Sequence, residues 1–371
     1  MNYMFACCGT GGHINPALAI ASEIRRRDPD SKMLFVGADR NMEKHLIPRA
    51  GFDLVNIKMS GLIRGISPRN IVRNAATLKN LAFAGREAAK HISSFKPDAV
   101  VGTGGYISYP VLKKAAQMGI PTYIHESNAS PGLATKMLSS TVTNVFVAFP
   151  GMESLYKRPE RVIFTGTPVG AGFRDTHKES GTAAVNKKPL VVSFWGSLGA
   201  ELMNEVMVGF ISRNIADDSF DHIHATGKNG GAAKMMERLK QSGSQGELPQ
   251  GIQIREYIDD MPSVMKNADI VLCRAGGMTI AELAALRKPS ILVPSPYLPN
   301  DQQTKNAARI CDAGGALAVK ENECSGDALY TAVMTLLQDK ERMDNMAASL
   351  GVLSANNAEE MIADIILKNN C

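Results

Sequence analysis

Short apolar runs rich in β-branched residues alternate with longer helical patterns along the whole chain. The runs include KMLFVG, PDAVVG, PTYIHE and NVFVAF in the first half, and PLVVSFWG, HIHATG, IQIREY, ADIVLC and PSILVP in the second. A glycine-rich or polar turn follows each run, and usually a helical pattern comes next. This alternation is typical of βα units, whose strands form parallel sheets. We therefore expect an α/β fold built on parallel sheets.

The length of the chain and one irregular segment indicate two domains. At 371 residues the chain is longer than one ordinary domain. Residues 165–190 are rich in Gly, Thr, Lys and Pro and have no periodicity, which predicts a domain boundary. We expect a first domain over residues 1–165, a second over 166–352, and an amphipathic helix of about residues 353–371 that packs back on the first domain. Two doubly wound domains of this kind would face each other across a cleft.

The composition is that of an ordinary globular protein. The chain is 44% hydrophobic and 21% charged, and no apolar run approaches the roughly 20 residues that span a bilayer. No basic region precedes the few apolar residues at the N-terminus, so we expect no secretory signal. The six cysteines form no C-x-x-C pair, which favours reduced cytosolic thiols. Aromatic residues make up only 6% of the chain, so we do not expect nucleic acid as a partner.

Positive charge is concentrated in residues 61–96, which we call the basic segment. Its charge is +6, against +5 for the whole chain. Leucine, isoleucine and phenylalanine lie between the basic residues, a mixture that suits the surface of an anionic membrane. A solvated helix with its apolar side on the core is the simpler alternative, and the sequence leaves both open. The basic residues are Arg64, Arg69, Arg73, Lys79, Arg86, Lys90 and Lys96, and the only acid is Glu87.

Glycine-rich turns directly follow three of the apolar strands. GTGG occurs at residues 9–12 and again at 102–105, and WGSLGA occupies residues 195–200. A turn of this kind opens a helix, so its backbone N–H groups and the positive helix end favour an anion such as a phosphate. Neither GTGG turn fits the dinucleotide pattern G-x-G-x-x-G, because Ile14 and Ile107 stand in place of the last glycine, and no P-loop motif occurs. We therefore expect neither NAD nor a P-loop nucleotide site.

Candidate metal ligands are sparse in the sequence. A metal-dependent sugar transferase would have Asp-x-Asp just after a strand, whereas Asp28 and Asp30 precede a strand and are interpreted as a turn. His222 and His224 fall on one face of a predicted strand, but no third ligand is near them in the sequence. We expect no metal in the site and no cofactor.

Seven motifs together resemble one known family. GTGGHINPALAIA, GTGGYISYPV, HESNASPGLATKML, GSLGA, YIDDM, RAGGMTIAE and DQQTKNA occur in the order and spacing of the MurG family, the undecaprenyldiphospho-muramoylpentapeptide β-N-acetylglucosaminyltransferases of peptidoglycan synthesis. The resemblance covers nearly the whole chain and implies a GT-B fold with two Rossmann-like domains. It also implies inverting transfer of N-acetylglucosamine from UDP-GlcNAc to the 4-hydroxyl of MurNAc in undecaprenyl-diphosphate-linked MurNAc-pentapeptide. The enzyme would be peripheral, on the cytoplasmic face of the cell membrane.

The resemblance further implies which residues form the site. His13 would lie near the reacting hydroxyl and suits a general base, because an unperturbed imidazole is mostly neutral near pH 7. Glu126 in HESN is the rival base, and a simple helix cap is the alternative role for His13. The implied substrate contacts are Thr10, Gly11, Gly12, Gly104, Gly105, Tyr106, Asn128, Ser197, Ile258, Gly277, Met278, Thr279, Glu282, Gln302, Gln303 and Asn306. Among these, the backbone of Ile258 would recognise uracil, and Gln303 and Asn306 would contact the donor sugar.

Two positions on the donor side have competing interpretations. Thr279 and Glu282 fit the capping box T-x-x-E, which the local pattern favours. The resemblance implies instead that Glu282 accepts hydrogen bonds from the two ribose hydroxyls of UDP, since a carboxylate offers two acceptor oxygens. Gly170 stands where the family usually has an arginine that contacts the diphosphate, and Arg174 is the candidate replacement.

Two other functions are compatible with part of this pattern. Another GT-B enzyme acting on a different lipid would keep the nucleotide-side motifs but would lose GTGGYISYP and HESN, which are both present. A catalytically silent protein that binds a UDP-sugar would keep the donor site without turnover. The glycine at position 170 keeps this second alternative open.

Overall fold

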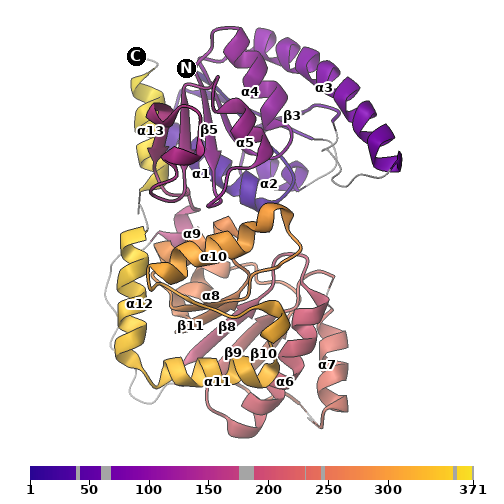
Figure 1. The fold of residues 1–371 in the computed structure, drawn as a ribbon, viewed down its shortest axis with the longest axis vertical. Coiled ribbons are helices and arrows are strands. Elements are labelled where there is room, and N and C mark those ends of the chain that lie inside the picture. The colour runs from indigo at the N-terminus through magenta and orange to yellow at the C-terminus, as the bar shows by residue number, and fades with distance from the viewer. Residues whose placement is uncertain are drawn as a thin grey trace. The chain divides into compact units, whose positions relative to one another are not determined.

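The chain folds into two compact units, each with one parallel β-sheet (Figure 1). The computed structural model describes residues 1–38, 42–59, 68–174, 188–229, 231–243, 247–353 and 357–369. The first unit is Met1–Ala171 with Asn357–Cys371, and the second is Gly172–Asn356. The boundary between the units thus falls between residues 171 and 172, six residues after the boundary that the sequence predicted between residues 165 and 166. Two Rossmann-like α/β units of this kind are those of the GT-B fold, as expected.

The first unit has a seven-stranded sheet in the order β3-β2-β1-β4-β5-β6-β7. The chain leaves β1 toward β2 and β3, then crosses to β4 on the other side, so β1 and β4 flank the topological switch point where such folds bind ligands. The first GTGG turn follows β1, whereas the second, which the sequence placed after a strand, begins inside β4: residues 102–104 end the strand and Gly105 starts the turn. The strands are β1 (Asn2–Cys7), β2 (Lys32–Gly37), β3 (Asp53–Asn56), β4 (Ala99–Gly104), β5 (Thr122–Glu126), β6 (Asn144–Val147) and β7 (Val162–Phe164), and the helices are α1 (Gly11–Arg27), α2 (Glu43–Arg49), α3 (Pro68–Phe95), α4 (Ser108–Gln117), α5 (Leu133–Leu138) and α13 (Ala358–Lys368).

The second unit has a six-stranded sheet in the order β10-β9-β8-β11-β12-β13. Its switch point lies between β8 and β11, so the WGSLGA turn and the RAGG turn follow neighbouring strands. The strands are β8 (Leu190–Phe194), β9 (Asp221–Ala225), β10 (Ile252–Arg255), β11 (Ile270–Cys273), β12 (Ser290–Leu292) and β13 (Leu317–Ala318), and the helices are α6 (Glu201–Asp217), α7 (Ala232–Gln241), α8 (Met261–Asn267), α9 (Gly277–Ala285), α10 (Gln302–Asp312), α11 (Gly326–Leu337) and α12 (Lys340–Leu353). Short 3₁₀ turns occur at Glu153–Leu155, Pro159–Arg161, Ala171–Phe173, Pro299–Asp301 and Glu321–Glu323.

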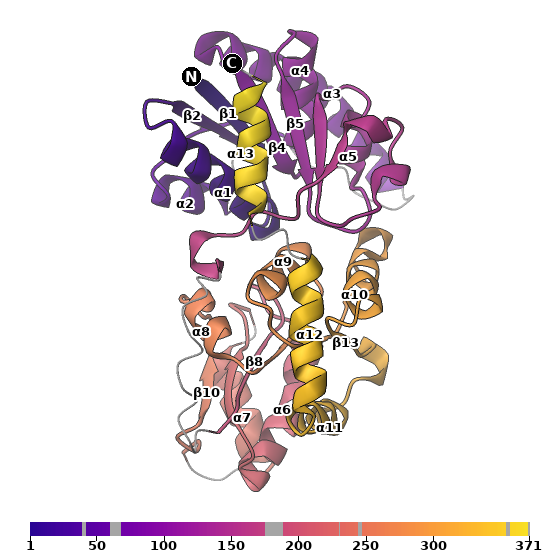
Figure 2. The same ribbon diagram turned by 90° about the vertical axis from the view of Figure 1, so that its left-hand side faces the viewer.

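The last helix, α13, belongs to the first unit although it follows the second in sequence (Figure 2). The sequence predicted this helix at about residues 353–371, and the structure has it at Ala358–Lys368. Its residues Ile362, Ala363 and Ile366 are fully buried in the same apolar core as α1 and β1. Burial of this apolar face against α1 is the main stabilisation of the helix in its place.

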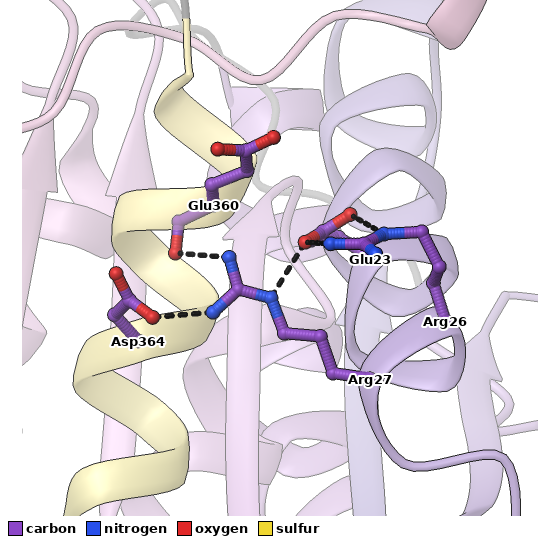
Figure 3. Close-up of polar contacts among 5 residues, drawn as sticks. All are labelled: Glu23, Arg26, Arg27, Glu360 and Asp364. Carbon is purple, nitrogen blue, oxygen red and sulfur yellow. Dashed lines mark hydrogen bonds and ion pairs between the residues drawn. The ribbon is translucent and has the colours of Figure 1, made fainter.

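A charged network closes the polar edge of the α1–α13 contact (Figure 3). Arg27 of α1 pairs with Asp364 and donates to the carbonyl oxygen of Glu360 on α13. The almost fully buried carboxylate of Glu23 accepts from Arg26 at 2.8 and 2.9 Å and from Arg27 at 2.6 Å. Hydrogen bonds and charge from Arg26 and then Arg27 hold the pKa of Glu23 at about 2. Glu23 therefore supports the arginine that reaches across to α13.

The basic segment lies largely on α3, and the structure describes only part of it. Arg86, Lys90 and Lys96 have exposed side chains, and Phe83 is 60% exposed beside Arg86. The structure does not describe Arg64, and it does not describe the side chains of Arg69, Arg73 and Lys79. In the part of the chain that the structure describes, no helix has the length and apolar character to cross a membrane.

Candidate active site

His13 lies in the first turn of α1, at the carboxyl end of β1. Its Nδ1 is 3.0 Å from the carbonyl oxygen of Cys8. A carbonyl only accepts, so Nδ1 has the proton and Nε2 has the free lone pair. The N-cap of α1 is Thr10, which makes no side-chain cap bond, and the His13 ring turns back to the end of β1. The alternative that His13 caps its helix is therefore wrong, and its geometry is that of an oriented imidazole with Nε2 as acceptor.

The second GTGG turn packs directly against this histidine. A Cβ on Gly104 would lie 2.5 Å from Cδ2 and 2.9 Å from Nε2 of His13, closer than any side chain allows. A Cβ on Gly105 would lie 2.5 Å from the carbonyl oxygen of Cys8. Both glycines also have positive φ, at 115° and 77°. Gly104 and Gly105 thus have a packing role that the sequence analysis did not assign, since they let the two turns meet around His13.

Glu126 is the other candidate base, and its carboxylate is already saturated. Oε1 accepts from the backbone N–H and side-chain amide of Asn128 at 3.1 and 3.0 Å. Oε2 accepts from the Gly132 N–H and the Thr135 hydroxyl, both at 2.8 Å. An ionised carboxylate has about four acceptor positions, and all are used here. Glu126 therefore organises the HESN turn and holds Asn128, and His13 is the candidate with a free acceptor atom.

The other predicted residues of the first unit lie around the same two turns. Thr10 is exposed, while Gly11, Gly12 and Tyr106 are half-buried. Gly11 begins α1, so the positive end of a 17-residue helix faces this region. The structure thus gathers the predicted acceptor-side residues at the switch point between β1 and β4.

On the second unit, Ser197 is exposed in the turn after β8. A Cβ on Gly199 would run into the backbone of Thr226 and Gly227, so this turn packs against the loop after β9. Gly199 also has a φ of 80°. This backbone contact requires glycine at position 199, and the side chain of Ser197 remains exposed to solvent.

Glu282 lies on α9, but Thr279 does not cap that helix. The N-cap is Gly276 and the helix begins at Gly277, so Thr279 is already inside it. The capping-box interpretation is therefore wrong: the RAGG turn starts the helix three residues earlier than the local pattern favours. No hydrogen bond or ion pair joins the Glu282 carboxylate to another residue in the described part of the chain. Burial raises the pKa of Glu282 to about 8.

Several donor-side residues support the turn rather than exposing a side chain. Asn306 is fully buried and donates to the carbonyl oxygen of Ala275 at 3.1 Å, so it holds the RAGG turn and is not presented as an exposed sugar ligand. Gln303 accepts from the Ser295 N–H at 2.7 Å, which leaves its amide N–H groups as donors. The side chains of Ile258 and Met278 are also buried, so these residues offer only backbone groups. Gln302, Gly277 and Thr279 are half-buried.

The histidine pair on β9 is part of an interior cluster. The Ser193 hydroxyl is 2.8 Å from Nε2 of His222 and 2.7 Å from Nδ1 of His224. All three side chains are fully buried, and burial lowers the pKa of both histidines, that of His224 to about 3. Across the described ranges, no three histidine, cysteine, aspartate or glutamate side chains gather as a metal site would require. The pair links β8 to β9 inside the second unit.

Comparison with known proteins assigns a class to each unit. Residues 3–147 match the glycosyltransferase family 28 N-terminal domain, and residues 190–365 match the glycosyltransferase family 28 C-terminal domain. Together the two matches define a two-domain glycosyltransferase.

Similar whole chains narrow the class. The chain is 39% identical to the UDP-N-acetylglucosamine–N-acetylmuramyl-(pentapeptide) pyrophosphoryl-undecaprenol N-acetylglucosamine transferase of Acetivibrio thermocellus over 96% of this chain and 95% of the relative. It is 38% identical to the transferase of the same name from a Thermoanaerobacter species, over 99% of each chain. The crystal structure of Acinetobacter baumannii MurG is similar with a TM-score of 0.74 at 25% identity, over 99% of each chain. The chain belongs to the MurG family, as the seven motifs indicated.

Proposed function

We propose that the chain transfers N-acetylglucosamine from UDP-GlcNAc to the 4-hydroxyl of MurNAc on undecaprenyl-diphosphate-linked MurNAc-pentapeptide, the step that completes the lipid-linked disaccharide of peptidoglycan synthesis. The relatives are named for transfer of this sugar to a pyrophosphoryl-undecaprenol acceptor. The observation that supports the chemistry most directly is the orientation of His13, whose Nε2 is left as the acceptor atom between the two GTGG turns.

The acceptor hydroxyl must lose its proton as it attacks, because an alcohol is a weak nucleophile near neutral pH. In the proposed step this proton passes to Nε2 of His13. The hydroxyl oxygen forms a bond to the anomeric carbon on the face opposite the diphosphate. The bond between that carbon and the diphosphate oxygen breaks, and UDP leaves with the electron pair. One displacement of this kind inverts the anomeric configuration.

The departing diphosphate needs hydrogen-bond donors that already point at it. The turn at Ser197 and the N-terminus of α9 at Gly277 follow neighbouring strands, and both offer backbone N–H groups. Glu282 accepts from the two ribose hydroxyls in this proposal, because its half-buried carboxyl group pairs with no described residue. Backbone donors supply the charge stabilisation, so we expect turnover without a divalent metal ion.

We also propose that the basic segment docks on anionic lipid at the cytoplasmic face of the membrane. The described part of the segment supports this, since Arg86, Lys90 and Lys96 are exposed and the exposed Phe83 ring lies beside Arg86. Basic residues attract anionic headgroups and an aromatic ring enters the interface, so both contributions act on one helix. Docking there would bring the protein to its lipid-linked acceptor.

Transfer of radiolabelled N-acetylglucosamine from UDP-GlcNAc to a soluble short-chain analogue of the lipid acceptor tests the proposed function. The expected result is a labelled disaccharide-lipid product, formed equally well in EDTA. Binding of UDP-GlcNAc without product would support the silent binding protein, and product only with a different lipid would support another GT-B enzyme. Loss of activity in EDTA with recovery in magnesium would contradict the metal-free step.

A further inference from the structure

Glu43 is a buried carboxylate that the proposed mechanism does not use. It is the first residue of α2, it is fully buried, and it follows the end of β2 closely in sequence. Its Oε1 accepts from the Ala38 N–H at 3.1 Å and its Oε2 accepts from the Gly9 N–H at 3.3 Å. A Cβ on Gly37 would lie 2.9 Å from Cγ of Glu43, so this close approach requires glycine. The carboxylate therefore joins the loops that follow β1 and β2.

The Gly9 N–H and the Cys8 carbonyl are the two ends of one peptide unit. On one side this unit donates to Glu43 at 3.3 Å, and on the other it accepts from Nδ1 of His13, with 3.0 Å between the nitrogen and the oxygen. A peptide that donates to a carboxylate is polarised, because electron density moves toward its carbonyl oxygen. The oxygen becomes a stronger acceptor for the imidazole N–H. Carboxylate, peptide and imidazole thus form one chain of hydrogen bonds.

The neighbouring side chains do not interrupt this chain. The thiol of Cys8 and that of Cys7 are buried, and burial raises the pKa of Cys8 to about 12 and that of Cys7 well above its usual value. Both thiols are therefore neutral near pH 7. A side chain at position 105 would run into the Cys8 carbonyl oxygen, so glycine there leaves room for this carbonyl. Among the described residues, the Cys8–Gly9 peptide is the hydrogen-bond partner of the His13 ring, and Glu43 lies behind this peptide.

We propose that Glu43 is a positioning residue for His13 and acts through the Cys8–Gly9 peptide. It holds and polarises that peptide, so that the His13 proton stays on Nδ1 and the lone pair on Nε2 stays available to the acceptor hydroxyl. The proposal rests on the proposed role of His13 as the base. The arrangement has the logic of a carboxylate that orients a catalytic histidine, with one peptide unit between the two side chains. No proton reaches Glu43 in this scheme.

The tautomer of His13 in the resting protein tests the proposal without any turnover. Side-chain ¹⁵N NMR of the full chain labelled at histidine distinguishes Nδ1–H from Nε2–H, and loss of a signal in His13→Ala assigns His13. We expect Nδ1–H in the wild type and an increased Nε2–H population in Glu43→Gln, because glutamine lacks the charge and one of the two acceptor oxygens. Glu23→Gln, at another buried carboxylate of the same unit, should leave the tautomer unchanged. An unchanged tautomer in folded Glu43→Gln would overturn the proposal.

A double-mutant cycle on kcat tests the same connection during turnover. Glu43→Gln should lower kcat by about 10- to 100-fold with little change in the KM for UDP-GlcNAc, the range for a group that orients another. In the His13→Ala background the same substitution should change kcat by less than about 2-fold, because residues that act as one unit are not additive. Full, independent losses in both backgrounds would overturn the proposal and make Glu43 a fold residue.

The two proposals fail in different ways. If His13→Ala leaves kcat unchanged, the base assignment fails whatever the tautomer does, and the positioning role fails with it. If His13→Ala loses activity while Glu43→Gln alters neither the tautomer nor kcat, only the role of Glu43 fails.

Discussion

Replacing Glu282 by glutamine should remove the pH dependence of donor binding. Burial raises the pKa of Glu282 to about 8 in the unliganded protein, so only about a tenth of the molecules have an ionised carboxylate at pH 7. Two ribose hydroxyls that donate to this group favour its ionised form. The affinity for UDP-GlcNAc should therefore rise with pH and level off above pH 8.

The size of the effect follows from the same value. With a pKa of about 8, the ionised fraction rises by about 25-fold between pH 6.5 and pH 8.5, and the Kd should fall by the same factor. At pH 8.5, Glu282→Gln should weaken binding by about 1.5 to 3 kcal/mol, the range for hydrogen bonds to a charged group. Calorimetric titration with UDP-GlcNAc measures both, since its diphosphate does not titrate in this range. Glu237→Gln, on the exposed side of α7, is the matched control.

The stability of the same variant gives an independent check. A carboxyl group with a raised pKa in the folded state makes folding less favourable as pH rises from about 4.5 toward 8. Glu282→Gln should therefore raise the Tm of the unliganded protein at pH 8 while it lowers donor affinity. Donor binding that is independent of pH in the wild type, or equally dependent on pH in Glu282→Gln, would refute the reasoning.

Gly104→Ala should displace the His13 ring and lower kcat. Gly119→Ala is also at positive φ but has open space around its Cβ, so it should cost only about 1 to 2 kcal/mol of stability. Equal kcat values for the two variants would contradict this prediction. Glu23 should stabilise the protein above pH 4.5 and lose this effect as the pH falls toward 2. Urea unfolding should therefore show Glu23→Gln to be about 1 to 3 kcal/mol less stable than the wild type at pH 7. Below pH 4.5 the free energy of unfolding of Glu23→Gln should depend less on pH than that of the wild type. Replacing Arg86, Lys90 and Lys96 by glutamine should weaken sedimentation with anionic vesicles by about 1 kcal/mol per residue at low salt; equal binding to neutral and anionic vesicles at every salt concentration would remove the docking proposal.

The sheet architecture was predictable because each parallel strand is a short, buried apolar run. Residues 3–7 of β1 are fully buried, as expected for a strand covered on both faces, and the glycine turn after it marks the strand end. The order of motifs gave the family, because seven spaced motifs are far more specific than any one of them. The sequence therefore predicted strands, turns and motifs, because each of these is formed by consecutive residues.

The contacts inside the site were not predictable, because they join distant segments. Glu43 reaches Gly9 from a different βα unit, and no local pattern marks it. Gly104 was predicted as a substrate contact, and the structure adds that glycine is required there because the His13 ring packs against it. At Thr279 the local capping pattern was overridden by the glycines that start α9 earlier. Side-chain roles of this kind depend on the packing of turns that only the folded sheet brings together.

The kcat of His13→Ala compared with that of Glu126→Gln tests the central claim most directly. His13→Ala should lower kcat by about 10²- to 10⁴-fold with donor affinity nearly unchanged, the loss expected for a general base. Glu126→Gln should lower the Tm, since it disturbs four hydrogen bonds, and should lower kcat of the folded protein far less than His13→Ala does. His45→Ala, at an exposed histidine on α2, is the control for loss of an imidazole. Near-normal kcat in His13→Ala together with a large loss in Glu126→Gln would contradict the account.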